Sequence, residues 1–144
     1  MALDKDLEIR EDMEEADIIT KLLEADPEHV PTMVIPLKRL GIPVTIKALT
    51  GKQVSRIRER NTQSIKTKKG PVDKLDYENF NIGLIVQASV KPKWDDPKLL
   101  NKLKASSGTE VVKRFLLAGE ISLLGEGVLD VSGFNLDLDD IKNS

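Results

Sequence analysis

Helix caps and helix breakers recur at short intervals in the second half of the chain, and this spacing limits each helix there to a few turns. Asp96 is suited to be the N-cap of a helix, and Pro97 after it takes the first helical position. Proline is tolerated there because the backbone amide at that position has no hydrogen-bond partner in the helix. The run Ser106-Ser107-Gly108-Thr109 ends that helix and caps another, and Gly119-Glu120 restarts the chain. Gly133-Phe134 is suited to closing a helix through the left-handed conformation. The spacing predicts helices over about 97–105, 109–118 and 120–132.

Two further helices are predicted upstream, on either side of a polar segment. A capping box predicts one over about 50–61. Asp73 can cap another over about 73–90, which must end before Pro92 because a residue that precedes proline avoids helical angles. Residues 62–71, between these helices, hold three lysines and one isoleucine, and we expect a solvated loop there.

Residues 33–48, before the helix predicted over 50–61, lack helical spacing, and their apolar residues alternate or occur in short runs. Residues 33–35 and 44–48 are rich in β-branched side chains, which favour strands. Pro36 and Pro43 each withhold a hydrogen-bond donor, so an irregular hairpin over 33–48 with exposed edges fits better than a central sheet. The sequence therefore predicts a mainly α fold of the α+β class, in which four to five short helices pack with one small N-terminal β-hairpin.

Charge is segregated along the chain, although the 144 residues together carry a net charge of only −2. Residues 1–31 hold eleven acidic and three basic residues, a net charge of −8, whereas residues 38–74 hold eleven basic and two acidic residues, a net charge of +9. The last ten residues, 135–144, are again acidic and polar. We expect an acidic N-terminal arm over 1–31, a single globular domain over 32–134, and a flexible acidic tail over 135–144.

The acidic arm contains one amphipathic segment. Ile18, Ile19, Leu22 and Leu23 recur at the spacing of one helical face, in a helix that ends before Asp26-Pro27. Isolated helices of about three turns are marginal in water, so this helix should form only when its apolar face meets a surface. Docking on the domain or on a second copy is the ordinary outcome for such a face. The alternative is a partner-binding site, for which the candidate residues are Ile18, Ile19, Leu22, Leu23 and Trp94.

The composition argues against most enzyme chemistry. The chain has no cysteine and a single histidine, His29, so thiolate nucleophiles, disulfides and the common zinc sites are excluded. No glycine-rich phosphate loop is present, and the acidic runs 95–96 and 137–140 lack the pattern of a calcium-binding loop. We expect no catalytic residue, no cofactor and no metal site, and therefore no enzymatic activity. Without a bilayer-length apolar run or a signal-peptide pattern at the N-terminus, we expect a cytoplasmic protein with no membrane contact.

The basic stretch 38–74 is the feature from which a function can be argued on physical grounds alone. It suits phosphates, so a small regulatory nucleic-acid-binding protein is the alternative function. The stretch contains no aromatic side chain for base stacking, which makes nucleic acid a poor candidate partner. A better use is attraction between this stretch and the acidic arm, within one molecule or between copies, which predicts a homo-oligomer that weakens with salt.

Several short runs, in order and spacing, resemble the XkdN-like phage tail assembly chaperones, and the chain looks close to a member from a Bacillus defective prophage. Each run alone also has an ordinary structural explanation, as a helix cap, a helix breaker or a set of core residues. The resemblance rests on the order and spacing of all the runs together. The runs lie between Ile35 and Phe134 and comprise Leu40-Gly41, Val44–Thr50, Asn79–Val86, Val90–Pro92, Asp96–Leu100, Glu110–Arg114, Leu117–Ile121 and Ser132–Phe134.

The resemblance implies a non-enzymatic protein of phage or prophage virion morphogenesis. Members of such families bind the long, helical tape measure protein, keep it soluble while the tail is assembled, and leave before the tail is complete. The partners it implies are the tape measure protein and, further, the tail tube protein. No catalytic or contact residue carries over from the family, and this sequence departs from the family in its acidic arm, residues 1–31.

Overall fold

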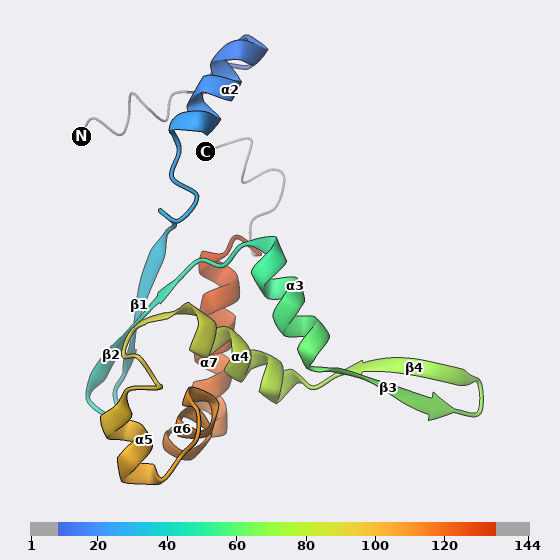
Figure 1. Ribbon diagram of the computed structural model, residues 1–144, viewed down its shortest axis with the longest axis vertical. Helices are drawn as coiled ribbons and strands as arrows, with labels where there is room; N and C mark the ends of the chain where they lie inside the picture. Colours follow the sequence, from blue (N-terminus) through green and yellow to red (C-terminus); the bar gives the residue numbers. More distant parts are fainter. Residues whose placement is uncertain (1–8, 135–144) are drawn as a thin grey trace.

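The computed structural model describes residues 9–134, which form six helices and five strands in the order shown in Figure 1. The predicted tail over 135–144 and the first eight residues of the predicted arm lie outside the described residues. The elements are α2 (Glu15–Glu24), β1 (Thr32–Leu37), β2 (Ile42–Lys47), α3 (Gly51–Arg60), β3 (Thr62–Thr67), β4 (Gly70–Leu75), α4 (Tyr77–Ala88), β5 (Ser89–Lys91), α5 (Pro97–Leu103), α6 (Gly108–Phe115) and α7 (Ala118–Val131).

A three-stranded antiparallel sheet in the order β1-β2-β5 forms one side of the body. Its register pairs Ile35 with Val44 on the inner face and Pro36 with Pro43 on the outer face. Proline has no backbone N–H to donate. Because Pro36 and Pro43 lie opposite each other, the hydrogen bonds that they cannot make are confined to one residue pair of the two strands. Gly41 takes a positive φ of 67° in the turn that joins the first two strands.

Helix α7 is the centre of the packing, because it contacts both the sheet and α4. Helix α4 is apolar around most of its circumference and also packs on α3 and α6. The buried core joins these elements through Leu37, Val44, Ile46, Val54, Ile57, Ile82, Leu84, Ile85, Val111, Val112, Leu124 and Val128. Fully burying a side chain of this size contributes about 1.5–3 kcal/mol, so this cluster is the main source of stability.

Side chains that the sequence marks as caps begin three helices of the body, α3, α5 and α6. Thr50 and Gln53 form the capping box of α3, with both of its hydrogen bonds present. Asp96 accepts from the backbone N–H of Lys98 at the start of α5, and Ser107 accepts from that of Glu110 at the start of α6. The short helices are therefore set by local sequence signals as well as by packing.

The prediction of a mainly helical fold with one small hairpin is wrong, because the described residues contain five strands in two antiparallel sheets. Residues 62–71, predicted to be a loop, belong mostly to a second hairpin, β3 and β4, which projects from the body in Figure 1. The sequence hides this hairpin because almost every side chain in it is exposed, so no alternation between apolar and polar residues marks it.

Three predicted helix boundaries are corrected as well. Asp73 lies in β4, and Asp76 caps α4 instead by accepting from the backbone N–H of Asn79. Residues 89–91 leave the helix to pair with β2, an interaction across the fold that local sequence does not encode. Leu116 and Leu117 are extended and separate α6 from α7.

Candidate functional site

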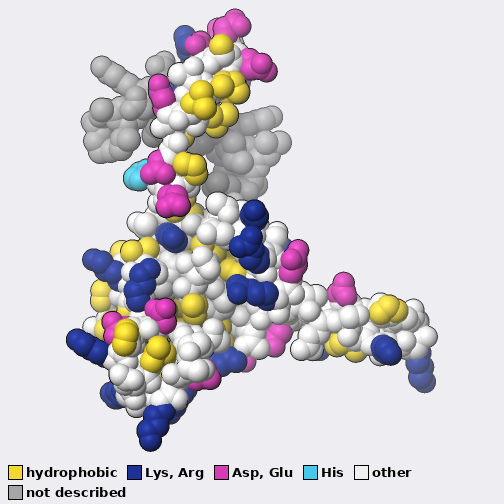
Figure 2. Space-filling model, in the orientation of Figure 1, with side chains coloured by type: hydrophobic (Ala, Val, Ile, Leu, Met, Phe, Trp, Pro, Cys, Tyr) yellow, Lys and Arg dark blue, Asp and Glu magenta, His cyan; other side chains and the backbone are white. Residues whose placement is uncertain are grey.

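Helix α2 presents an apolar face that nothing in the described part of the chain covers. Ile18, Ile19, Leu22 and Leu23 are between 43% and 80% exposed, and no residue of the helix is buried. Figure 2 shows these hydrophobic side chains gathered on one side of the helix, among acidic groups. Glu15 and Asp17 in the first turn and Lys21 in the last turn suit the helix dipole, which supports the helix locally. We call these four side chains the α2 apolar face.

A short extended linker connects α2 to the body. Asp26 organises its first turn by accepting from the backbone N–H of Glu28. The linker then joins the sheet, where the Ala48 N–H donates to the carbonyl oxygen of Pro31 at 2.8 Å. Helix α2 therefore stands away from the body at one end of the molecule, as Figure 1 shows, and Val30 is the one half-buried residue between its last turn and β1.

Trp94 lies apart from this face, in the core. Its side chain is only 4% exposed, and its indole N–H donates to the Ser89 hydroxyl at 2.8 Å. The Ser89 hydroxyl in turn donates to the carbonyl oxygen of Ile85 at 2.6 Å. Trp94 therefore secures the segment before α5 to the end of α4, and the structure does not bring it together with the α2 apolar face.

The basic stretch 38–74 is distributed over the turn between β1 and β2, the end of β2, α3 and the projecting hairpin, and two of its cations are engaged within the body. The Arg39 guanidinium pairs with the Glu120 carboxylate at 2.7 Å and also donates to the carbonyl oxygen of Phe115. The Arg58 guanidinium lies over the Phe80 ring, 5.4 Å from its centroid. Most of the other cations extend over α3 and the projecting hairpin.

The Arg39 and Glu120 pair ties the turn between β1 and β2 to the start of α7. The Glu120 carboxylate also accepts from the backbone N–H of Leu117, and the hydrogen bond from Arg39 is the main reason that the pKa of Glu120 is lowered from its ordinary value. The same bond raises the pKa of Arg39. This contact has a structural role at the edge of the body.

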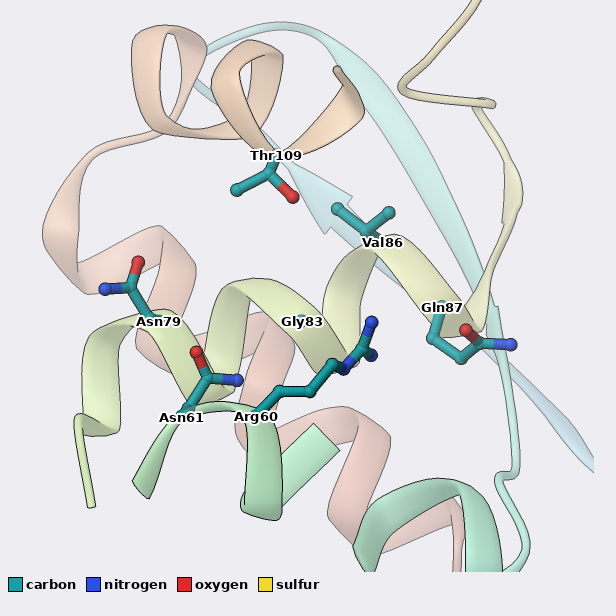
Figure 3. A pocket seen from close by; sticks show the side chains of 7 residues that line it. All are labelled: Arg60, Asn61, Asn79, Gly83, Val86, Gln87 and Thr109. Carbon is teal, nitrogen blue, oxygen red and sulfur yellow. The ribbon is translucent and has the colours of Figure 1, made fainter. Parts of the chain in front are cut away.

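A pocket of about 230 Å³ lies between α3, α4 and the start of α6. Figure 3 shows the side chains that line it, which are Arg60, Asn61, Asn79, Gly83, Val86, Gln87 and Thr109. Two of its amides are already engaged: Asn61 donates to the Ile57 carbonyl oxygen, and Asn79 to the Asp76 carboxylate. No carboxylate or imidazole lines it, so it offers no group for general acid–base chemistry.

Residues 9–134 contain neither a metal-ligating cluster nor a membrane-spanning helix. No group of three or more histidine, cysteine, aspartate or glutamate side chains is placed to hold a metal ion in this part of the chain. None of its helices is long and apolar enough to cross a bilayer.

The projecting hairpin is the surface feature that the sequence reasoning missed. Its apolar side chains, Ile65 and Val72, are register partners and are 41% and 52% exposed. The one local signal was the two-residue turn Lys68-Lys69 followed by Gly70, which takes a positive φ of 109°.

Comparison with known proteins connects this architecture to phage tails. The model of the phage XkdN-like tail assembly chaperone proteins matches residues 19–143. Two Bacillus subtilis strain 168 proteins are similar over 126 residues, 85% of each chain: the uncharacterized protein YqbN at 27% identity and the phage-like element PBSX protein XkdN at 26%. The crystal structure of YqbN shares the fold, with a TM-score of 0.54 at 20% identity over 74% of this chain and 87% of that one. Since the family model covers most of its length, the chain belongs to the XkdN-like phage tail assembly chaperones.

Proposed function

We propose that this chaperone binds the tape measure protein of its phage or prophage and keeps it soluble, as a cytoplasmic binding protein without enzymatic activity. The observation that carries the proposal is the α2 apolar face, which is exposed on a helix that buries none of its own residues. A soluble protein rarely leaves such a face without a partner, and an amphipathic helix is a common means of engaging an apolar stripe on another helix.

The chemistry of the client fits this surface. A long helical protein that has not yet been enclosed by a tail tube exposes apolar stripes, and such stripes drive aggregation. Ile18, Ile19, Leu22 and Leu23 offer a small apolar surface, while the acidic residues around them keep the complex hydrated. Trp94 has no part in the proposed contact because it is buried. A small apolar contact also releases its client readily, as an assembly factor must.

Direct binding with purified proteins tests the proposal. The variant Ile18→Ser/Leu22→Ser should weaken binding to tape measure segments about tenfold or more, which corresponds to about 1.4 kcal/mol of binding free energy. Its melting temperature should not change, because neither side chain is buried. The control is Leu123→Ser, which removes a comparably exposed leucine from α7.

If the wild-type chain, the α2 variant and the control bind tape measure segments with equal affinity, the α2 apolar face is not the binding site. Failure of the wild-type chain to bind any tape measure segment would overturn the proposed function itself. Nucleic-acid binding is not proposed, because no group of aromatic side chains lies among the cations of 38–74.

A further inference from the structure

Helix α3 and the hairpin that follows it form one continuous basic limb, which we define as residues 51–75. The limb carries eight basic and two acidic residues, a net charge of +6. In Figure 1 it runs outward from the body and ends at the Lys68-Lys69 turn. The hairpin has no buried residue, and its contact with the core of the described chain is made at its base, by the half-buried Leu75. A two-stranded hairpin is marginal alone, so this one gains stability if a partner covers it.

One face of the hairpin carries its exposed apolar pair, Ile65 and Val72, and leads into a depression at its base. Because Ile65 pairs with Val72, their side chains lie together on the same face. Beside them is a hollow of about 440 Å³, and near it Tyr77 is 72% exposed. The hollow is lined by Gln63, Ile65, Lys74, Leu75, Asp76 and Tyr77. This face offers an apolar contact with a basic rim.

The arm is complementary to the limb in charge, chemistry and length. Residues 9–31 carry eight acidic and two basic residues, a net charge of −6. Glu15 lies one turn before Ile18 and Ile19, so acidic and apolar side chains share a face. The ten residues of α2 span about 15 Å, and six residues of β3 span about 20 Å, so the helix fits along the hairpin.

We propose that the α2 apolar face of one copy docks on the Ile65–Val72 face of the basic limb of a second copy. Within one molecule the two surfaces lie apart, with α2 beyond one end of the body and the hairpin projecting from another side (Figure 1). Each copy carries both surfaces, so two copies make the contact twice around a two-fold axis. The interaction forms without any client, so the dimer does not rest on the proposed function, although both contacts use the same helix face.

The size and chemistry of this contact set its strength. Four side chains from α2, two from the limb (Ile65 and Val72) and the neighbouring Tyr77 make a small contact, whereas stable protein interfaces bury about 1,200–2,000 Å². The contact therefore depends on its opposite charges, which are screened over about 10 Å at 0.1 M salt. The dimer should be weak and should dissociate as salt rises. The client proposed above uses the same helix face, so client binding opens the dimer.

The molar mass of the full chain in solution, measured by light scattering, tests the proposal. We expect a dimer at about 50 mM salt and a monomer at about 500 mM, with the dissociation constant rising about tenfold or more. Lys66→Glu/Lys68→Glu/Lys69→Glu should be monomeric at both salt concentrations. The control Lys93→Glu/Lys98→Glu/Lys102→Glu makes the same change in charge at exposed lysines outside the limb and should still dimerise.

Cross-linking locates the contact, because the natural chain has no cysteine. A tagged Leu22→Cys copy mixed with an untagged Ile65→Cys copy should give a disulfide-linked heterodimer at low salt. Replacing Ile65→Cys with Leu123→Cys should abolish that product. A wild-type monomer at low salt would overturn the proposal. So would a Leu22→Cys/Ile65→Cys chain that forms only an intrachain disulfide, since the arm would then dock on its own limb.

Discussion

Individual glycines in α7 allow its close approach to neighbouring elements. A Cβ atom added at Gly125 would lie 2.9 Å from the Asn81 Cβ on α4 and still closer to the rest of that side chain. Because the Asn81 Cβ is fixed to its backbone, the two helices would have to separate. At Gly119, near the start of the same helix, an added Cβ would meet nothing within 4 Å.

Gly125→Ala should lower the free energy of unfolding by about 1–3 kcal/mol, because overpacking outweighs the better helix propensity of alanine. Gly119→Ala should leave stability unchanged or raise it by up to about 1 kcal/mol. Urea denaturation of the two variants checks this pair. A Gly125→Ala chain as stable as the wild type would show that α4 and α7 are not packed as described.

The Arg39 and Glu120 pair is the residue contact that should respond to pH. The pKa of Glu120 is lowered in the folded chain, chiefly by its hydrogen bond from Arg39. A lowered carboxyl pKa stabilises the fold above the ordinary value of about 4.3, and this contribution is lost as pH falls through the folded-state value. The pair should therefore contribute at neutral pH and cease to do so in acid.

Arg39→Ala should lower the melting temperature at pH 7, and the difference from wild type should shrink as the pH falls below the ordinary carboxyl pKa of about 4.3, towards the lowered pKa of Glu120. A small difference should remain, because Arg39 also donates to the Phe115 carbonyl oxygen. Lys38→Ala, at the adjacent exposed lysine, is the control and should have little effect at either pH. A difference for Arg39→Ala that is the same at pH 3 and pH 7 would contradict this role.

At the scale of elements, local signals in the sequence were sufficient where caps and apolar periodicity coincide. Thr50 and Asp96 each begin a helix, as their sequence context indicates, and Ser107 begins α6 within the predicted run 106–109. The hairpin of β3 and β4 gave no such signal, because a strand with both faces exposed lacks the apolar alternation that marks one. β5 exists only because β2 lies beside it.

The candidate site shows the same division between local and tertiary information. Helical spacing alone places the residues of the α2 apolar face on one side of a helix. The position of Trp94 depends on Ser89 and on the packing of α4 and α5, which no local pattern encodes. The local sequence therefore does not show whether Trp94 is buried or exposed.

Shortening the hairpin tests whether it is an independent element. Gln63 and Lys74 are register partners, so replacing residues 64–73 with Asn-Gly should close a two-residue turn between them. The free energy of unfolding should change by less than about 0.5 kcal/mol, because no replaced residue is buried. Ile57→Ala, in the core side of α3, should cost about 2–5 kcal/mol. A comparable loss in both variants would show that the hairpin supports the body.

At the scale of the whole molecule, the structure consists of a packed body with an acidic helix and a basic hairpin extending from it (Figures 1 and 2). The body holds the buried core, and its fold is shared with YqbN. The two extensions bury almost none of their own side chains. We therefore expect the body to determine stability and the extensions to determine which proteins are bound.

The amount of soluble tape measure protein in cells, with and without co-expression of this chain, tests the central claim most directly. The account predicts a clear rise in soluble tape measure protein with the wild-type chain and with Leu123→Ser, and a much smaller rise with Ile18→Ser/Leu22→Ser. Tape measure protein that remains equally insoluble with and without the wild-type chain would contradict it.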